Sequence, residues 1–391
     1  MQIREMTVDD ADVSLRASRD AFGGPLQDRA AFTIGGGIHR WAIFDGPVLA
    51  AKANDREYSS LIGGRELCTA GVAGVLVTPE YRGTGLAREV MTHLFRTARE
   101  RGAVLSTLFR TAPALYRSLG YEQVAELCLG ELPTAALRGL RVRNPTTVRR
   151  ATLQDVPAIK AVYARVASAG ACLLTRTGPC FTTTDEKLIE SFDGITVAVN
   201  PTGGISGYLS WKRGENWGPD GVLEVVELHG LDADSTESLL AVVGSFDAVT
   251  PMVRFRTSGL DPMHWLIPGA GWSVRDVKQY MLRVIDLAGA VEQRGWPESV
   301  AGAVEFSVLD GACPWNTGHH RLVLAGGRAV LEPGSGAAGM SITPRGLALL
   351  MAGDSTVAAL RRAGLIEGGT AADSILDAAM AGPRPAILDF F

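Results

Sequence analysis

The chain has 391 residues, a length typical of two or three domains, and a hydrophobic content of 46% with 20% charged residues. No apolar run approaches a membrane span and the first residues lack a signal-peptide core, so we expect a globular cytoplasmic protein without a membrane partner. The net charge of −4 argues against a nucleic-acid partner. The five cysteines are odd in number and lack metal-like spacing, so we expect neither a disulfide framework nor a metal site.

The opening of the chain, over residues 3–10, returns as a similar pattern over 148–155. Each stretch reads as a short strand followed by a capping box that begins a helix. Each copy continues into a hairpin that turns at Gly and Pro residues. The sequence therefore predicts two related domains in tandem. The two capping boxes and the linker between the copies are Thr7 with Asp10, Thr152 with Asp155, and residues 141–147.

A glycine-bearing turn connects a strand that ends at Pro79 to a helix with one apolar face and a glycine C-cap at Gly102. Gly83 and Gly85 leave backbone amides uncovered at the start of the helix, and Arg82 adds a cation. Free amides at the positive end of a helix dipole favour phosphate or pyrophosphate. The turn lacks the spacing of a Walker loop or a dinucleotide fingerprint. From the turn alone, a phosphate site and a simple tight connection both remain open.

Two motifs in this region resemble those of the GCN5-related N-acetyltransferases (GNAT). The first is Val-x-Pro-x-x-Arg-x-x-Gly-x-Ala over 77–87, and the resemblance implies that its amides hold the pyrophosphate of acetyl-CoA. The second is Tyr-x-x-x-Gly-aromatic over 116–121, which implies that Tyr116 protonates the departing thiolate while Tyr121 packs. Taken by itself, Tyr116 is better explained as a core aromatic, with Tyr121 packing beside it. The expected coenzyme-binding residues are Val75, Leu76, Val77, Arg82, Gly83, Thr84, Gly85, Leu86, Ala87, Arg88, Thr111 and Ala112.

The second copy lacks this chemistry. Its counterpart strand, at 223–228, is followed by Asp232, Asp234 and Glu237 in place of the arginine and the glycines. Carboxylates cap a helix N-terminus well but repel a pyrophosphate. We therefore predict a folded GNAT-like domain that binds no coenzyme, in which His229 is structural.

The last hundred residues combine strands with helices, which predicts a small α+β domain. A strand over 304–308 precedes a hairpin over 321–332, and Thr343 and Pro344 suit the start of a helix. This pattern resembles the sterol-carrier-protein-2 (SCP2) fold. The chain then ends in bulky apolar residues over 387–391, which predicts that its end docks against the protein.

Taken together, the chain resembles the Eis family of acetyltransferases. The expected fold is α+β, with a GNAT domain at 1–144, a coenzyme-free GNAT-like domain at 145–285 and an SCP2-like domain at 286–391. The resemblance implies acetyl transfer from acetyl-CoA to primary amines of aminoglycosides, polyamine-like compounds or lysine-containing peptides. It also implies Tyr116 as the general acid, the Phe391 carboxylate as the general base, and a hexamer. From the residues alone, Phe391 would be a hydrophobic anchor.

Some residues depart from the family pattern. The stretch 108–111 lacks the histidine that precedes the acid tyrosine in the best-studied branch, and Arg110 would repel cationic amines unless it points away. Asp20 and Phe22 lie near the positions where the family contacts amines. Two other functions stay open: a non-enzymatic acyl-CoA- or lipid-binding scaffold that keeps the loop as a relic, and a lipid carrier that works through the last domain.

Overall fold

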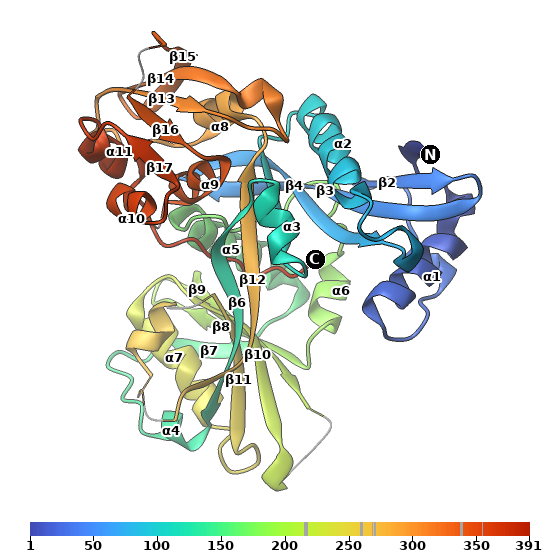
Figure 1. Ribbon diagram of the computed structural model, residues 1–391. Coiled ribbons are helices and arrows are strands. Elements are labelled where there is room, and N and C mark those ends of the chain that lie inside the picture. The colour runs from blue at the N-terminus through green and yellow to red at the C-terminus, as the bar shows by residue number, and fades with distance from the viewer. Residues whose placement is uncertain (215–217, 259–260, 268, 270, 337–338, 354) are drawn as a thin grey trace.

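Two β-sheets organise the protein (Figure 1). The computed structural model describes residues 1–391 except 215–217, 259–260, 268, 270, 337–338 and 354. The larger sheet has twelve strands in the order β1-β2-β3-β4-β5-β12-β6-β11-β10-β9-β8-β7, and the smaller has five in the order β15-β14-β13-β16-β17. The larger sheet contains the strands of both copies of the repeat, and the smaller sheet belongs to the C-terminal part.

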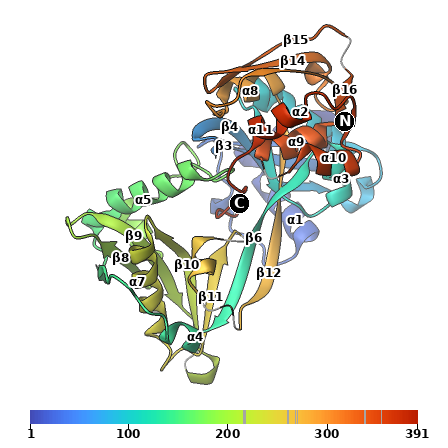
Figure 2. The same ribbon diagram turned by 90° about the vertical axis from the view of Figure 1, so that its left-hand side faces the viewer.

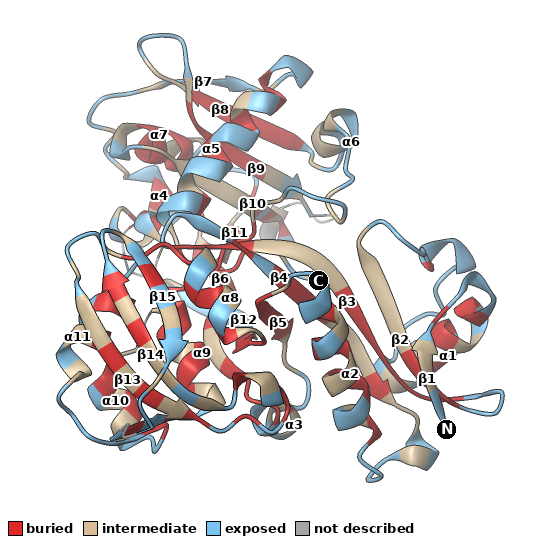
Figure 3. Ribbon diagram, turned by 90° about the horizontal axis from the view of Figure 1, so that it is seen from above, coloured by how far each residue is buried: buried red, intermediate tan, exposed pale blue. Residues whose placement is uncertain are grey.

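The first copy buries the apolar face of helix α2 against its strands. Five residues of α2 with helical spacing, from Val90 to Ala98, are fully buried, as their pattern predicts. Figure 3 shows buried residues along β4 and β5 and exposed ones on the outward side of α2. The strands are β1 (Gln2–Glu5), β2 (Ile38–Asp45), β3 (Val48–Ile62), β4 (Arg65–Val77), β5 (Leu105–Phe109) and β6 (Glu122–Pro133), and the helices are α1 (Ala11–Phe22), α2 (Leu86–Glu100), α3 (Pro113–Ser118) and α4 (Ala135–Arg138).

The second copy begins with the same local geometry as the first. Arg4 donates to the two oxygens of Asp10 at 2.7 and 2.8 Å, and Arg149 donates to those of Asp155 at 2.7 Å each. Both capping boxes are formed, which confirms the predicted repeat. The elements of the second copy are β7 (Thr147–Arg150), α5 (Val156–Ala169), α6 (Asp185–Glu190), β8 (Gly194–Val199), β9 (Ile205–Arg213), β10 (Val222–Gly230), α7 (Ala233–Gly244), β11 (Met252–Thr257) and β12 (Ser273–Val284).

The two copies share strands, which the sequence pattern does not predict. Strand β12 is the last strand of the second copy but lies between β5 and β6 of the first. The other edge of β6 pairs with β11 of the second copy. The sheet is therefore continuous across the expected boundary at residue 144, and each copy is completed by a strand of the other.

The C-terminal part is the predicted small α+β domain. Gly326 and Gly327, both with positive φ, turn the predicted hairpin, and the Thr343 hydroxyl caps helix α9 by accepting from the Gly346 amide. Its elements are α8 (Leu287–Gln293), β13 (Gly302–Val308), β14 (Gly318–Ala325), β15 (Arg328–Pro333), β16 (Met340–Ile342), α9 (Pro344–Ala352), α10 (Val357–Arg362), β17 (Ile366–Gly368) and α11 (Asp373–Met380).

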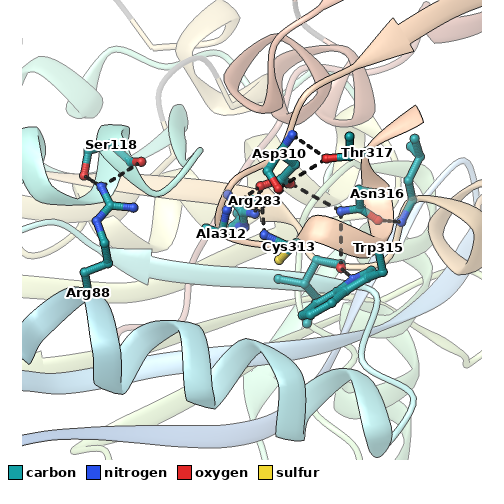
Figure 4. A network of polar contacts seen from close by, with 11 residues as sticks. Arg88, Ser118, Arg283, Asp310, Ala312, Cys313, Trp315, Asn316 and Thr317 are labelled. Atoms are coloured by element: carbon teal, nitrogen blue, oxygen red, sulfur yellow. Dashed lines mark hydrogen bonds and ion pairs between the residues drawn. The ribbon is translucent and has the colours of Figure 1, made fainter. Parts of the chain in front are cut away.

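A buried ion pair fastens this domain to the large sheet (Figure 4). Arg283 on β12 donates to both oxygens of Asp310, which follows β13, at 2.7 and 2.8 Å, and both side chains are almost inaccessible to solvent. Asp310 also accepts from the amides of Ala312 and Cys313. A second link joins Glu122 on β6 to Arg345 on α9.

Candidate active site

Strands β4 and β5 separate at the centre of the first copy. They pair in parallel from Thr69 opposite Leu105 to Val72 opposite Leu108, and β4 then continues alone to Val77. A bulge against β3 accompanies the separation, at Gly74, whose φ of +61° is available mainly to glycine. The free edge of β4 over 73–77 therefore exposes backbone groups for a ligand to bind.

The turn after β4 presents free amides, as the sequence predicts. Gly83 and Gly85 adopt φ values of +80° and +87°, and nothing lies within 4 Å of a Cβ atom built on either. In the described part of the chain, the backbone amides of residues 83–87 donate no hydrogen bond to another protein group. Gly85 is the N-cap of α2, so these donors lie at the positive end of the helix. The geometry fits a bound pyrophosphate.

A cavity of about 300 Å³ joins the separated strands, the turn and Tyr116. Seven of the twelve predicted coenzyme residues line it, together with residues of α1 and α3 that the sequence did not assign to the coenzyme. The lining residues are Ala21, Phe22, Val75, Leu76, Val77, Arg82, Ala87, Thr111, Ala112, Leu115 and Tyr116.

The other five predicted residues do not line this cavity. The side chain of Leu86 is buried in the core beneath α2, so only its amide is available to a ligand. Gly85 and Arg88 border an adjacent hollow of about 410 Å³ between α2 and the loop after β13. Arg88 donates to the Ser118 hydroxyl at 2.8 Å, which ties α2 to α3 (Figure 4). Gly83 and Thr84 lie exposed in the turn.

Tyr116 combines burial with access to the cavity. Its side chain is 3% exposed, and this burial raises its pKa, although a hydrogen bond with Thr111 acts in the opposite direction. A phenol in this state is protonated at neutral pH and serves as a proton donor. Tyr121 has a different environment: it is fully buried and its hydroxyl lies 2.6 Å from the Ser106 hydroxyl. Its role is packing, as expected.

The end of the chain reaches the place where β4 and β5 separate. The Phe391 ring lies 5.0 Å from the Tyr58 ring on β3 and 5.6 Å from the Phe109 ring on β5, measured between centroids. A Cβ atom on Gly71 of β4 would lie 3.2 Å from the Phe391 ring. The predicted docking of the end is confirmed for Ile387, Leu388 and Phe391, whereas Phe390 remains exposed although its ring contacts Phe109 and Lys278.

Arg110 is not among the residues that line this cavity. Its Nε donates to the Gln279 side chain on β12 at 3.2 Å. The partner is neutral, so Arg110 keeps its positive charge.

The corresponding turn of the second copy is occupied by other contacts. Asp232 caps α7 by accepting from the Ser235 amide at 2.7 Å, and Glu237 binds Arg143 of the linker at 2.8 Å. A cavity of about 730 Å³ lies at the end of β10, but the C-terminal segment forms part of its wall. His229 lies edge-on to the Tyr208 ring at 5.4 Å.

No group of three or more His, Cys, Asp or Glu side chains in the described part of the chain could hold a metal ion. None of the described helices is both long and apolar enough to cross a membrane.

Comparison with known proteins agrees with this architecture. Family models of the acetyltransferase (GNAT) domain match residues 2–124 and 173–284, and a sterol carrier protein domain matches 287–388. An uncharacterised N-acetyltransferase of Streptomyces coelicolor is 27% identical over 328 residues, which are 78% of this chain and 76% of that protein. A GCN5-related N-acetyltransferase from Kribbella flavida superposes with a TM-score of 0.85 at 29% identity, over 100% and 98% of the chains. Eis1 from Mycobacterium abscessus shares the fold over both whole chains, with a TM-score of 0.81 and 17% identity.

The chain is therefore an acetyltransferase with two GNAT domains and a C-terminal sterol carrier protein domain, and it shares its overall fold with Eis1. The GNAT fold implies acetyl-CoA as the acetyl donor and a separate acceptor substrate.

Proposed function

We propose that the protein transfers the acetyl group of acetyl-CoA to primary amines in the cavity lined by Tyr116, with the Phe391 carboxylate as the general base. The observation that carries this proposal is the position of Phe391. Its ring packs against β3 and β5 and lies over Gly71 of β4, just before the point where β4 leaves its partner strand. The same separated strand end lines the Tyr116 cavity.

The donor half of the site rests on the turn and the free edge of β4. When bound, acetyl-CoA supplies the thioester that is attacked. The open amides of 83–87 and Arg82 would hold its pyrophosphate, and the edge over 75–77 would hold its pantetheine arm. The Val75 amide would stabilise the oxyanion.

Two proton transfers are assigned to two groups. An amine is an ammonium ion at neutral pH and must lose a proton before its nitrogen can attack. A terminal carboxylate has an ordinary pKa near 3.5, so it is an anion that attracts the ammonium and accepts its proton, directly or through water. Tyr116, whose pKa is raised by burial, holds the proton that the thiolate takes up. Attack leaves a second proton on the acetylated nitrogen; this proton passes through solvent to the Tyr116 phenolate, while Phe391 releases the proton that it accepted to solvent.

The acceptors that we propose are aminoglycosides, polyamine-like compounds and lysine side chains. Arg110 is not among the residues that line the Tyr116 cavity, and its Nε donates to Gln279 on β12. The C-terminal domain is packed with buried side chains of β13, β14, α9 and α11, which argues against a lipid carrier. By resemblance to the Eis family, we further propose a cytoplasmic hexamer, for which light scattering of the purified protein is the test.

The experiment for the activity itself is a thiol-release assay with acetyl-CoA and a panel of aminoglycosides, polyamines, lysine peptides and arylamines. The proposal predicts release that depends on the amine, with a mass increase of one acetyl group on its nitrogen. Release that never exceeds the amine-free rate, while acetyl-CoA still binds, would instead support a binding scaffold.

A further inference from the structure

The last residues of the chain cross the second GNAT domain before they reach the first. Figure 2 shows the C-terminus between the lobe that carries α5 and the strands β6 and β12. The Ala386 amide donates to the Ala171 carbonyl, and the Ile387 amide donates to the Ser258 hydroxyl, each at 2.8 Å. Ile387 and Leu388 are buried. The segment is thus held by the second domain at Ala386 and Ile387 before it reaches the first domain.

Arg176 of the second domain binds this segment at Asp389, two residues before the end of the chain. Arg176 Nε donates to the Asp389 carboxylate, at 2.9 Å to Oδ1 and 3.2 Å to Oδ2. The same guanidinium forms an ion pair with Glu227 on β10 and lies 3.8 Å from the centre of the Tyr163 ring. The Tyr163 hydroxyl donates to the Leu174 carbonyl at 2.8 Å and lies 3.4 Å from Asp389 Oδ2. Arg176 is therefore the main partner of the Asp389 carboxylate.

The backbone at Arg176 is in a strained conformation, which indicates that its surroundings hold this residue in place. Its φ is +57°, and Arg176 and Cys172 are the two residues other than glycine in the described part of the chain with positive φ. Such conformations are uncommon for residues with a side chain and persist where the surroundings enforce them. Residues flanking Arg176 add to the edge of β3, since the Thr175 amide donates to the Ser59 carbonyl at 3.0 Å. The arginine is thereby fixed relative to the first domain as well.

Fixing Asp389 restricts where the chain can end. An extended residue advances the backbone by about 3.3 Å, so the Phe391 carboxylate lies within about 7–10 Å of the ion pair between Arg176 and Asp389. We propose that Arg176, through Asp389, is a positioning residue that sets the place of the Phe391 carboxylate in the active site of the first domain. The inference rests on the proposed function, and it gives the second GNAT domain a purpose in catalysis without a coenzyme of its own.

The first test is Asp389→Ala in the full-length protein. The variant removes the ion pair with Arg176 but leaves Arg176 paired with Glu227. The buried arginine of the second domain therefore keeps a counter-ion. The matched control is Asp373→Ala, which breaks the Arg361 ion pair on α11 of the C-terminal domain. We expect kcat of Asp389→Ala to fall at least tenfold, while its KM for acetyl-CoA stays within twofold of wild type. Asp373→Ala should keep both kcat and KM close to the wild-type values.

A second readout reports the position of the chain end without relying on activity. Carboxypeptidase A removes C-terminal aromatic residues from accessible ends, so we expect it to release Phe391 at least fivefold faster from Asp389→Ala than from wild type or Asp373→Ala. A pair of variants at the arginine gives the same comparison: Arg176→Lys keeps a cation and should retain more kcat than Arg176→Met.

Deletion of Phe391 separates this inference from the proposed function. If the deletion lowers kcat while Asp389→Ala turns over at the wild-type rate, the positioning role is wrong and the terminal base stands. If the deletion leaves kcat unchanged, the terminal base is wrong and the positioning role falls with it. Loss of kcat in both, with faster release of Phe391 from Asp389→Ala, supports the inference.

Discussion

The ring of Phe391, the last residue of the chain, lies 5.0 Å from the ring of Tyr58 on β3 of the first domain. Gly71 on the adjacent strand β4 gives both rings their space, because a Cβ atom there would lie 2.4 Å from the Tyr58 ring and 3.2 Å from the Phe391 ring. The C-terminus thus meets the first domain just before the point where β4 and β5 separate. The proposed chemistry depends on this meeting, since the coenzyme turn itself carries no acid or base.

Removing the Tyr116 hydroxyl should slow catalysis while the coenzyme still binds. We expect Tyr116→Phe to lower kcat by about 10²-fold or more, the usual contribution of a general acid, with little change in KM for acetyl-CoA. Tyr121→Phe is the matched control, because it loses a hydrogen bond to Ser106 and hence about 1 kcal/mol of stability, but no proton donor. Steady-state kinetics of both variants decides the point, and equal kcat values in the two would remove Tyr116 from the acid role.

The pH dependence of turnover should reflect the raised pKa of Tyr116. Burial keeps its phenol protonated beyond the ordinary tyrosine pKa of about 10. We therefore expect the alkaline fall of kcat that this acid governs to lie above pH 10 in the wild type and to be missing from Tyr116→Phe. A fall assigned to this residue near neutral pH would contradict the assignment.

Gly85 should matter for the coenzyme because of its conformation. Gly85→Ala places a side chain at φ +87°, which costs about 1–2 kcal/mol and disturbs the amides that face the pyrophosphate. Gly102→Ala is the control, since its φ is +91° beyond the far end of the same helix and its surroundings are equally open. We expect similar losses of thermal stability in both variants but a raised KM for acetyl-CoA in Gly85→Ala alone. A similar KM in both would show that the turn does not bind the coenzyme.

The ion pair between Arg283 and Asp310 should be costly to break. Asp310→Asn leaves the Arg283 charge buried without a counter-ion, and such changes cost about 3–5 kcal/mol. Glu332→Gln breaks an exposed pair with Arg321 and should cost less than about 1 kcal/mol. Urea unfolding followed by circular dichroism measures both losses. Equal, small losses would mean that the buried pair does not hold the C-terminal domain to the large sheet.

Asp55 should make the protein less stable as the pH rises from about 4 to 6. Burial raises its pKa from 3.8 to about 6, although Arg101 opposes the shift, and Oδ1 of the carboxylate has no hydrogen-bond partner in the described structure. The folded state therefore binds the proton more tightly than the unfolded state, and this stabilisation is lost as pH rises through the folded pKa. Asp55→Asn does not titrate, so its stability relative to wild type should increase across that interval by roughly 2–3 kcal/mol. A difference that is constant with pH would contradict this.

The sequence predicts the features that depend on neighbouring residues. The capping boxes of Asp10 and Asp155, the cap at Thr343 and the open turn at Gly85 each form from a few adjacent side chains, so their patterns are sufficient. The GNAT and SCP2-like domains follow from such patterns in order along the chain.

The features that were missed depend on distant segments. Strand β12 lies between β5 and β6. Several strands of the chain have a similar alternation of apolar and polar residues, so no local pattern determines which of them pair. The burial of the Leu86 side chain comes from its packing in the core of the first domain. Arg176 has an unremarkable sequence context, and its importance comes only from contacts with Glu227 and with the end of the chain.

The central claim is that the terminal carboxylate is the base, and deletion of Phe391 tests it most directly. The measurement is kcat for amine acetylation together with the dissociation constant of acetyl-CoA, compared between the wild type and the chain that ends at Asp389-Phe390. We predict a fall in kcat of at least 10²-fold with unchanged acetyl-CoA binding. Wild-type turnover by the shortened chain would contradict the claim.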